Sequence, residues 1–250
     1  MLIDKNTKQA ISENIEIKRI MSEGGVLWKK KSLGPGPTKL IGGNEDAGFY
    51  GECPASELIT GDELARRIGL TAGVSQFSDE PWLKFSYMGK TEFVAKKPFR
   101  HSISWNSINA VNVVFGNRTI KIGGNTYKVR LMKGKTEGRQ DDTSSYKGDI
   151  CKNSEWNKLM LPIHIKAPDK WQYPGNVNSP TENWNVGYTD NDLLTISRAG
   201  NGSYCWCQEY GQNSGNKLLR GLDDVSYSNN VTPSNNMLGF GWRPVLELVD

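Results

Sequence analysis

The feature that most constrains this chain is a break at residues 34–37, which read Gly-Pro-Gly-Pro. A proline cannot donate a backbone hydrogen bond, and it restricts the preceding residue to extended backbone, so neither a helix nor a central strand runs through this stretch. The length of 250 residues allows one large domain with a small appendage. We therefore predict a small N-terminal segment over residues 1–33 and a main domain over residues 34–250.

The N-terminal segment carries spaced isoleucines among charged residues, and Gly24 and Gly25 interrupt it. This pattern predicts a small β element of two or three strands with a glycine turn. A piece of this length buries too little surface to be stable alone, so we expect it to dock on the main domain or on another protein. The basic residues 29–31 favour a solvated linker edge over a phosphate site.

Short apolar runs bounded by glycine turns predict strands in the main domain. Two pairs of such runs, each joined by a turn that contains glycine, predict β-hairpins over residues 82–95 and 119–131. Alternating or apolar runs predict three further strands, over residues 203–209, 218–221 and 241–248.

Three segments carry the signals of short helices. Residues 60–69 have Thr60 as a candidate N-cap and Gly69 as a C-terminal stop. Residues 104–109 and 154–161 predict two more helices, the second with Asn153 or Ser154 as its cap. Because short helices accompany hairpins and long loops, the predicted fold class is α+β.

The composition argues against several classes of partner. The net charge is +4, from 31 basic and 27 acidic residues spread along the chain, which is too weak and dispersed to indicate nucleic-acid binding. We find no apolar run of membrane-spanning length and no apolar leader region at the start of the sequence, so we expect neither membrane insertion nor a signal peptide.

Side chains that carry catalysis or bind metals are sparse. His101 and His164 lack the spacing of metal ligands, and neither a nucleophile elbow nor a phosphate loop occurs. We therefore predict a protein that is not an enzyme and that has no metal or cofactor. Asp190 and Asp192 offer oxygen ligands for calcium, but a helix cap or a turn before Leu193 and Leu194 is the favoured role.

The cysteines are too few for a disulfide scaffold. In the strand predicted over residues 203–209, Cys205 and Cys207 lie on one face and Trp206 on the other. Two cysteines on the same face of one strand are poorly placed for a disulfide, so we expect two small buried side chains instead of a redox pair. The other two cysteines are Cys53 and Cys151.

Residues 222–238 form the most polar long stretch near the C-terminus, and tyrosine, serine and asparagine dominate it. Binding loops favour this composition because tyrosine supplies rigid contact area and the small polar residues supply adaptable hydrogen bonds. The alternative is that the same residues only provide turn chemistry. If the loop binds a receptor, the candidate site residues are Tyr227, Asn229, Asn230, Asn235 and Asn236.

Aromatic residues outside the regular patterns have two interpretations. Trp156 and Trp206 lie in regular patterns and are expected in the core, whereas Trp171, Trp184 and Tyr188 lie among Gly, Asn and Pro. The last three either pin long loops to the body, which is the favoured interpretation, or stack on a sugar face. Trp184 and Tyr188 are therefore included among the candidate binding residues.

Eight short segments of residues 39–249 are distinctive when taken together. They are 49–52 (FYGE), 55–61 (ASELITG), 93–98 (FVAKKP), 127–132 (YKVRLM), 154–157 (SEWN), 192–195 (DLLT), 202–206 (GSYCW) and 241–247 (GWRPVLE). With these segments, residues 39–249 resemble a family of tailed-bacteriophage virion proteins. The end of the chain is also similar to C-type-lectin-like domains of the formylglycine-generating-enzyme type.

The resemblance implies a C-type-lectin-like display domain over residues 34–250, with residues 1–33 attaching it to other virion proteins. It further implies a fibre or baseplate appendage on the virion, assembled in the cytoplasm of a bacterial host. In phage tropism determinants of this type, the stretch before the last strand contacts the receptor, here residues 222–238.

Two other functions stay open beside binding of a host-surface glycan or protein. The chain is alternatively a purely structural decoration, baseplate or capsid protein, in which the same loops contact neighbouring subunits. An enzyme that acts on cell-wall saccharide is the least favoured alternative, since no carboxylate pair is singled out. Because virion appendages are symmetric, we also expect a homo-oligomer.

Overall fold

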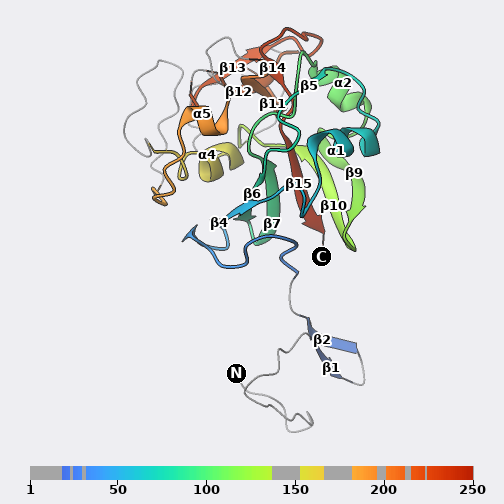
Figure 1. Ribbon diagram of the computed structural model, residues 1–250, viewed down its shortest axis with the longest axis vertical. Helices are drawn as coiled ribbons and strands as arrows, with labels where there is room; N and C mark the ends of the chain where they lie inside the picture. The colour runs from blue at the N-terminus through green and yellow to red at the C-terminus, as the bar shows by residue number, and fades with distance from the viewer. Residues whose placement is uncertain are drawn as a thin grey trace. The chain divides into compact units, whose positions relative to one another are not determined.

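The computed structural model describes residues 32–136, 153–165, 182–195, 201–211, 215–222 and 224–249, and the backbone of residues 19–22 and 25–29. The chain divides into two compact units, Met1–Leu33 with Asp250, and Gly34–Val249 (Figure 1). In the first unit, β1 (Arg19–Ser22) pairs antiparallel with β2 (Gly25–Lys29). This hairpin confirms the β element that was predicted around Gly24.

A seven-stranded sheet forms the base of the second unit, and all its neighbouring strands are antiparallel. Strands from the start and from the end of the unit belong to this one sheet, although they are not neighbours in it. In spatial order its strands are β3 (Gly42–Gly43), β4 (Ala47–Cys53), β6 (Trp82–Tyr87), β7 (Lys90–Ala95), β15 (Pro244–Val249), β10 (Asn125–Leu131) and β9 (Phe115–Ile122).

A second, four-stranded sheet lies above the first in the view of Figure 1. Its β14 pairs parallel with β11, and its other pairs are antiparallel. In spatial order its strands are β13 (Ser228–Val231), β12 (Lys217–Gly221), β11 (Tyr204–Tyr210) and β14 (Phe240–Gly241). A two-stranded pair, β5 (Val74–Ser75) with β8 (Arg100–His101), completes the strands described.

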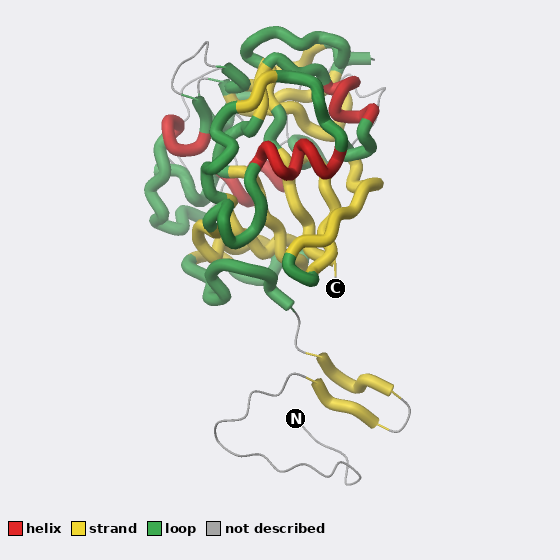
Figure 2. Tube along the Cα trace, turned by 45° about the vertical axis from the view of Figure 1, so that its right-hand side comes forward, coloured by secondary structure: helices red, strands yellow, loops and turns green. Residues whose placement is uncertain are grey.

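In the described ranges of the chain, four short helices lie beside the sheets (Figure 2). In α1 (Gly61–Ile68), Thr60 Oγ1 accepts a bond from Glu63 N and Gly69 takes a left-handed conformation, as predicted. The predicted helices near residues 104–109 and 154–161 are confirmed as α2 (Trp105–Ala110) and α4 (Glu155–Met160), and Ser154 caps the latter. The fourth helix is α5 (Asp190–Leu193).

The prediction of an α+β fold with a C-type-lectin-like domain is wrong. Strand accounts for 38% of the structure and helix for 14%, and large antiparallel sheets dominate it. The helix signals in the sequence are real, but the longest helix has only 8 residues. The sequence analysis also missed β4 and β13, because neither shows a clear apolar alternation.

The break at residues 34–37 is held against the larger sheet. Lys84 of β6 is fully buried, and its Nζ donates to the carbonyl oxygens of Pro35 and Pro37 at 2.7 and 2.6 Å. Burial lowers the pKa of Lys84 to about 8. The prolines, which donate no backbone hydrogen bond, thus contribute acceptors to a buried lysine.

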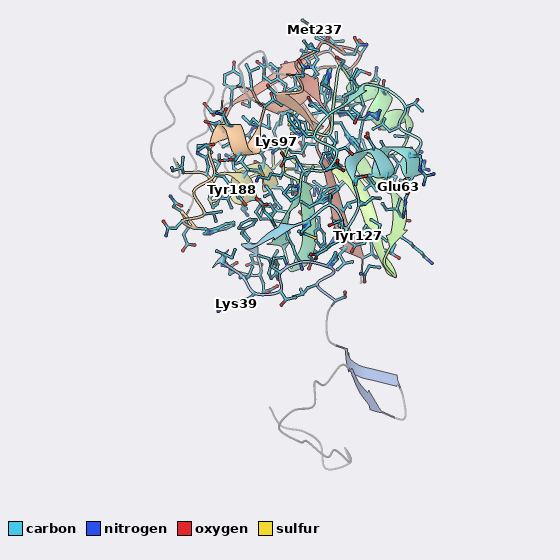
Figure 3. The ribbon with its side chains drawn as sticks, viewed as in Figure 1. Lys39, Glu63, Lys97, Tyr127, Tyr188 and Met237 are labelled. Atoms are coloured by element: carbon cyan, nitrogen blue, oxygen red, sulfur yellow. The ribbon has the colours of Figure 1, made fainter. Side chains whose placement is uncertain are left out.

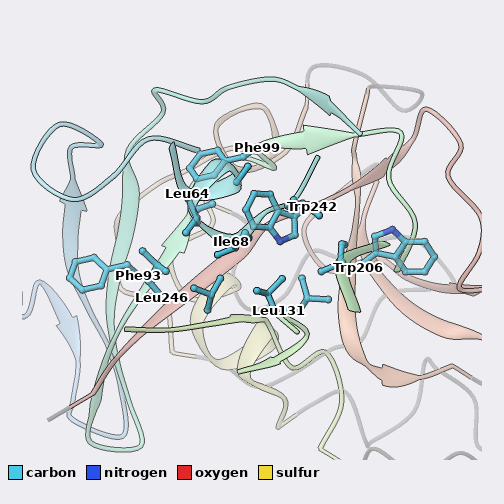
Figure 4. Close-up of a cluster of buried hydrophobic side chains, with 14 of the residues drawn as sticks. Leu64, Ile68, Phe93, Phe99, Leu131, Trp206, Trp242 and Leu246 are labelled. Atoms are coloured by element: carbon cyan, nitrogen blue, oxygen red, sulfur yellow. The ribbon is translucent and has the colours of Figure 1, made fainter. Parts of the chain in front are cut away.

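Strand β11 separates two hydrophobic clusters. Trp206 packs into the cluster drawn in Figure 4, together with Phe99, Trp242 and Leu246. Cys205 and Cys207 belong to the other cluster. Neither thiol takes part in a disulfide and both are fully buried, so the prediction of two small buried side chains opposite Trp206 is confirmed.

A buried ion cluster lies on the face of the seven-stranded sheet that is opposite to the hydrophobic cluster of Figure 4. Arg130 of β10 contacts the carboxylates of Glu92 and Glu155, and its Nε lies 3.1 Å from Glu247 Oε2. Burial, reinforced by the charge of Glu155, raises the pKa of Glu92 well above its usual range. Opposite charges lower the pKa of Glu247, which also pairs with Lys90 at 2.7 Å.

Within the described ranges, no helix is both long enough and apolar enough to cross a membrane.

Candidate functional site

The region predicted as a long loop, residues 222–238, contains a strand with one turn before it and two turns after it. Its strand β13 forms one edge of the four-stranded sheet, and residues 232–238 follow it. We call this surface the apical face and define it as Tyr204, Tyr227, Asn229, Asn230 and loop 232–238. Figure 3 shows Met237 of this loop and Lys39 at opposite ends of the second unit.

Arg220 of β12 anchors the start of the apical face from below. This fully buried side chain donates to the carbonyl oxygens of Ser226 at 3.1 Å and Tyr227 at 3.2 Å, and to Asn157 Oδ1 at 2.6 Å. Its guanidinium also lies 5.5 Å from the ring of Trp156. Arginine suits this position because its planar fork serves several acceptors at once.

The turn before β13 is fixed by its own side chains as well. Asp224 Oδ1 accepts bonds from the backbone N and the hydroxyl of Ser226, at 2.8 and 2.6 Å. Trp156 Nε1 donates to the carbonyl oxygen of Val225 at 2.7 Å. The backbone N of Val225 donates to Asp190 Oδ1 at 2.9 Å. Strand β13 therefore begins directly after a turn whose backbone is held by several hydrogen bonds.

Two of the predicted binding residues, Tyr227 and Asn229, come together beside Tyr204, whereas Asn230 follows Asn229 along β13 and points to the opposite face of the strand. The rings of Tyr227 and Tyr204 lie 6.1 Å apart, and Asn229 Nδ2 donates to the hydroxyl of Tyr204 at 3.2 Å. Asn216 Nδ2 donates to Asn230 Oδ1 at 2.9 Å. Tyr227, Asn229 and Asn230 are each half-buried, so part of each side chain faces solvent.

Loop 232–238 is a pair of turns with anchored backbone. Asn106 N donates to the carbonyl oxygen of Pro233 at 3.0 Å, and Gly202 N donates to that of Leu238 at 2.9 Å. Asn235 Oδ1 accepts from Met237 N at 3.1 Å, so its carbonyl shapes the second turn, while Asn236 is exposed.

The tip of this loop exposes two large apolar side chains. Met237 is 64% exposed and Leu238 is 52% exposed. Single exposed apolar residues are common, but two consecutive ones on a hydrogen-bonded loop form a patch that is typical of a contact surface. The sequence analysis passed over both residues in favour of the asparagines around them.

A lysine supports the apical face from beneath β13. Lys217 is 4% exposed, and its Nζ lies 3.2 Å from the ring centroid of Tyr210 and 4.1 Å from that of Trp105. Burial lowers the pKa of Lys217 to about 8. The aromatic faces stabilise the cation in a place that is largely closed to water.

Trp184 and Tyr188 do not lie on the apical face. Trp184 is 8% exposed and packs so closely on Gly42 that a Cβ atom at residue 42 would lie 2.5 Å from Trp184 Cβ. The hydroxyl of Tyr188 donates to Glu52 Oε1 at 2.6 Å. Both aromatics thus join residues 182–189 to β3 and β4, while their role in ligand binding stays a prediction.

The acidic residues of α5 have structural partners. Asp192 and Thr189 form a reciprocal capping box, which confirms the predicted helix cap before Leu193. Asp190 Oδ1 lies 3.1 Å from His164 Nε2 and also accepts the bond from Val225. His101 Nδ1 lies 2.9 Å from Ser102 Oγ. Among the described residues, no group of three or more His, Cys, Asp or Glu is arranged to hold a metal ion.

Comparisons with known proteins give little further information. No protein-family model matches the chain, and no curated protein matches it. Among solved structures, the chain is similar to Treponema denticola variable protein 1, at 10% identity and a TM-score of 0.27, over 70% of this chain and 91% of that chain. A similarity at this level supports no conclusion about fold or function.

Proposed function

We propose that this chain is a surface protein of a tailed-bacteriophage virion that binds a host-surface glycan or protein through its apical face. The observation that carries the proposal is the rigid loop 232–238, which exposes Met237 and Leu238 beside half-buried Tyr and Asn side chains. Interfaces combine an apolar anchor with such adaptable polar groups. The resemblance of residues 39–249 to phage virion proteins supports the assignment to a virion.

The arrangement of the second unit fits a display role. The apical loop lies at the end opposite Lys39, which follows closely on the start of the unit at Gly34. Residues 1–33 would attach the unit to other virion proteins, and several copies on one particle would raise a weak affinity by multivalency. In the alternative function, a decoration or baseplate role, the same face would contact a neighbouring subunit.

The experiment measures binding of the fluorescently labelled chain to intact cells of the bacterium in which its gene replicates. We expect the wild type to bind and a variant with Tyr227→Ala, Asn229→Ala and Asn230→Ala to bind at least about tenfold less. The matched control carries Asn117→Ala, Thr119→Ala and Lys121→Ala, which replace exposed side chains of β9. Circular dichroism verifies that each variant is folded.

The two functions predict different results. If the wild type binds and only the apical variant fails, the receptor-binding role is supported. If no folded form binds cells, the receptor-binding role is wrong, and the structural alternative gains support if the apical variant also fails to join assembled particles.

A further inference from the structure

A pocket lies on the flank of the second unit, away from the residues of the apical face. It has a volume of about 540 Å³, and seven residues from the segments 52–60 and 79–81 line it. Its polar lining consists of Glu52, Ser56, Thr60 and Asp79, and two prolines and an alanine complete it. The size falls within the range of small-molecule sites, which is about 300–1,000 Å³.

The two walls of the pocket are joined by hydrogen bonds, so the cavity is preformed. Ser78 accepts from Gly61 N at 2.8 Å through its carbonyl and from Asp62 N at 2.9 Å through its hydroxyl. Trp82 Nε1 donates to the carbonyl oxygen of Ile59 at 2.8 Å. These bonds join Ser78 and Trp82, which flank the wall of residues 79–81, to residues 59–62, which lie at the end of the other wall. A preformed site of this kind loses less conformational entropy when it binds a ligand.

Glu52 is oriented by two donors that share one of its oxygen atoms. Its Oε1 accepts from the hydroxyl of Tyr188 at 2.6 Å and lies 2.8 Å from Lys96 Nζ. Lys96 also lies over the ring of Tyr188, at 5.1 Å from its centroid. Both bonds use Oε1, so Oε2 remains as the acceptor that Glu52 offers to a ligand.

The donor and acceptor balance of the pocket defines the class of ligand. Glu52 and Asp79 supply carboxylate acceptors, whereas Thr60 Oγ1 already accepts from Glu63 N at 3.2 Å and so offers its proton. The pocket therefore needs a ligand that is rich in hydrogen-bond donors. Lys96 compensates the charge of Glu52, and water screens the charge of the exposed Asp79, so the pocket favours a neutral ligand over a strongly cationic one.

We infer that this flank pocket binds a neutral, hydroxyl-rich saccharide ring. Its hydroxyls donate to Glu52 and Asp79, and its C–H face lies on Pro54, Ala55 and Pro81. Desolvation of the apolar face adds to charge-assisted hydrogen bonds at its edge. The site is distinct from the apical face, so either one stands if the other fails.

The test is saturation-transfer NMR on the full chain with D-glucose, D-galactose, N-acetyl-D-glucosamine and L-rhamnose, each at about 10 mM because single-ring affinities are weak. Hexylammonium serves as the cationic probe. We expect at least one sugar to receive saturation from the wild type. We expect about tenfold weaker binding after Asp79→Asn, which keeps the shape of the side chain, and loss after Ser56→Trp, which fills the pocket.

Two matched variants control for the position of the change. Asp46→Asn alters an exposed aspartate outside the pocket, and Thr119→Trp places the same bulk on the exposed strand β9, which belongs to neither candidate site. Both are expected to keep the sugar signal. The inference is overturned if none of the four sugars receives saturation, if hexylammonium binds and the sugars do not, or if Ser56→Trp leaves the sugar signal unchanged.

Discussion

In the seven-stranded sheet the buried Arg130 contacts three carboxylates, those of Glu92, Glu155 and Glu247, whereas in the four-stranded sheet the buried Arg220 donates mainly to backbone carbonyls. The first arrangement joins strands β7 and β10 to α4 through charge pairs. The second joins β12 to the turn that leads into β13. The comparison indicates that one buried arginine stabilises the body of the unit, while the other sets the shape of the apical face.

The largest expected loss of stability follows from Arg130→Met. This change leaves Glu92 and Glu155 buried without their guanidinium partner, and breaking a buried ion pair in this way costs about 3–5 kcal/mol. Urea denaturation measures the free energy of unfolding. Lys121→Met, on the exposed edge of β9, is the control and is expected to change it by less than about 0.5 kcal/mol. Equal effects of the two changes would show that the buried ion cluster around Arg130 does not stabilise the seven-stranded sheet.

Arg220→Met is expected to cost somewhat less, about 3 kcal/mol, because it leaves neutral carbonyls unpaired instead of carboxylates. Its effect should also be local. Amide hydrogen exchange of residues 226–230 is expected to accelerate in this variant more than exchange of β7 or β10, and the reverse pattern is expected in Arg130→Met. Uniform acceleration across both sheets would show that Arg220 has no special link to the apical face.

The buried Glu209 of β11 is expected to lower the free energy of unfolding when its carboxylate is charged. Burial raises its pKa to about 7, and its Oε2 accepts from Gly134 N at 2.9 Å. The folded state thus holds a proton that the unfolded state loses above pH 4.5, so the stability that protonated Glu209 provides is present below pH 4.5 and is lost as the pH rises through 7.

Glu209→Gln is therefore expected to raise stability by about 2 kcal/mol at pH 8 and to change it little at pH 4.5. The difference in melting temperature between variant and wild type, measured at both pH values, gives the answer. Glu57→Gln, at an exposed glutamate, should show no such pH dependence. A gain that is the same at both pH values would show that the buried charge is not its cause.

Local signals made much of the smaller architecture predictable. Thr60 with Gly69, and Ser154 before α4, mark helix ends through chemistry that acts within one turn. The alternation around Trp206 likewise placed Cys205 and Cys207 on one face of β11. Such features depend on neighbours in the sequence, so the sequence alone contains them.

The sheet partners and the candidate sites could not be predicted in the same way. Strand β13 is polar except for its last residue, Val231, and it exists because it pairs with β12, which is a contact between separate segments. The flank pocket combines Glu52 with Asp79, and Tyr188 of residues 182–189 contacts Glu52. No spacing in the sequence brings these residues together. Met237 and Leu238, by contrast, were visible as an apolar pair in a polar stretch.

The smallest effect on stability is expected from that apolar pair. Changing Met237→Ser and Leu238→Ser removes side chains that are 64% and 52% exposed, so the free energy of unfolding should change by less than about 0.5 kcal/mol. If the pair anchors a receptor, binding to host cells should nevertheless fall about tenfold, because apolar anchors dominate contact surfaces.

The matched control uses exposed apolar residues outside the apical face. Ile41 is 62% exposed and Met88 is 70% exposed, and the change Ile41→Ser with Met88→Ser removes comparable area from the seven-stranded side of the unit. We expect this variant to bind cells as the wild type does. Equal loss of binding in both double variants would mean that binding depends on the exposed apolar area of the whole unit. The proposal that the apical face recognises the receptor specifically would then be wrong.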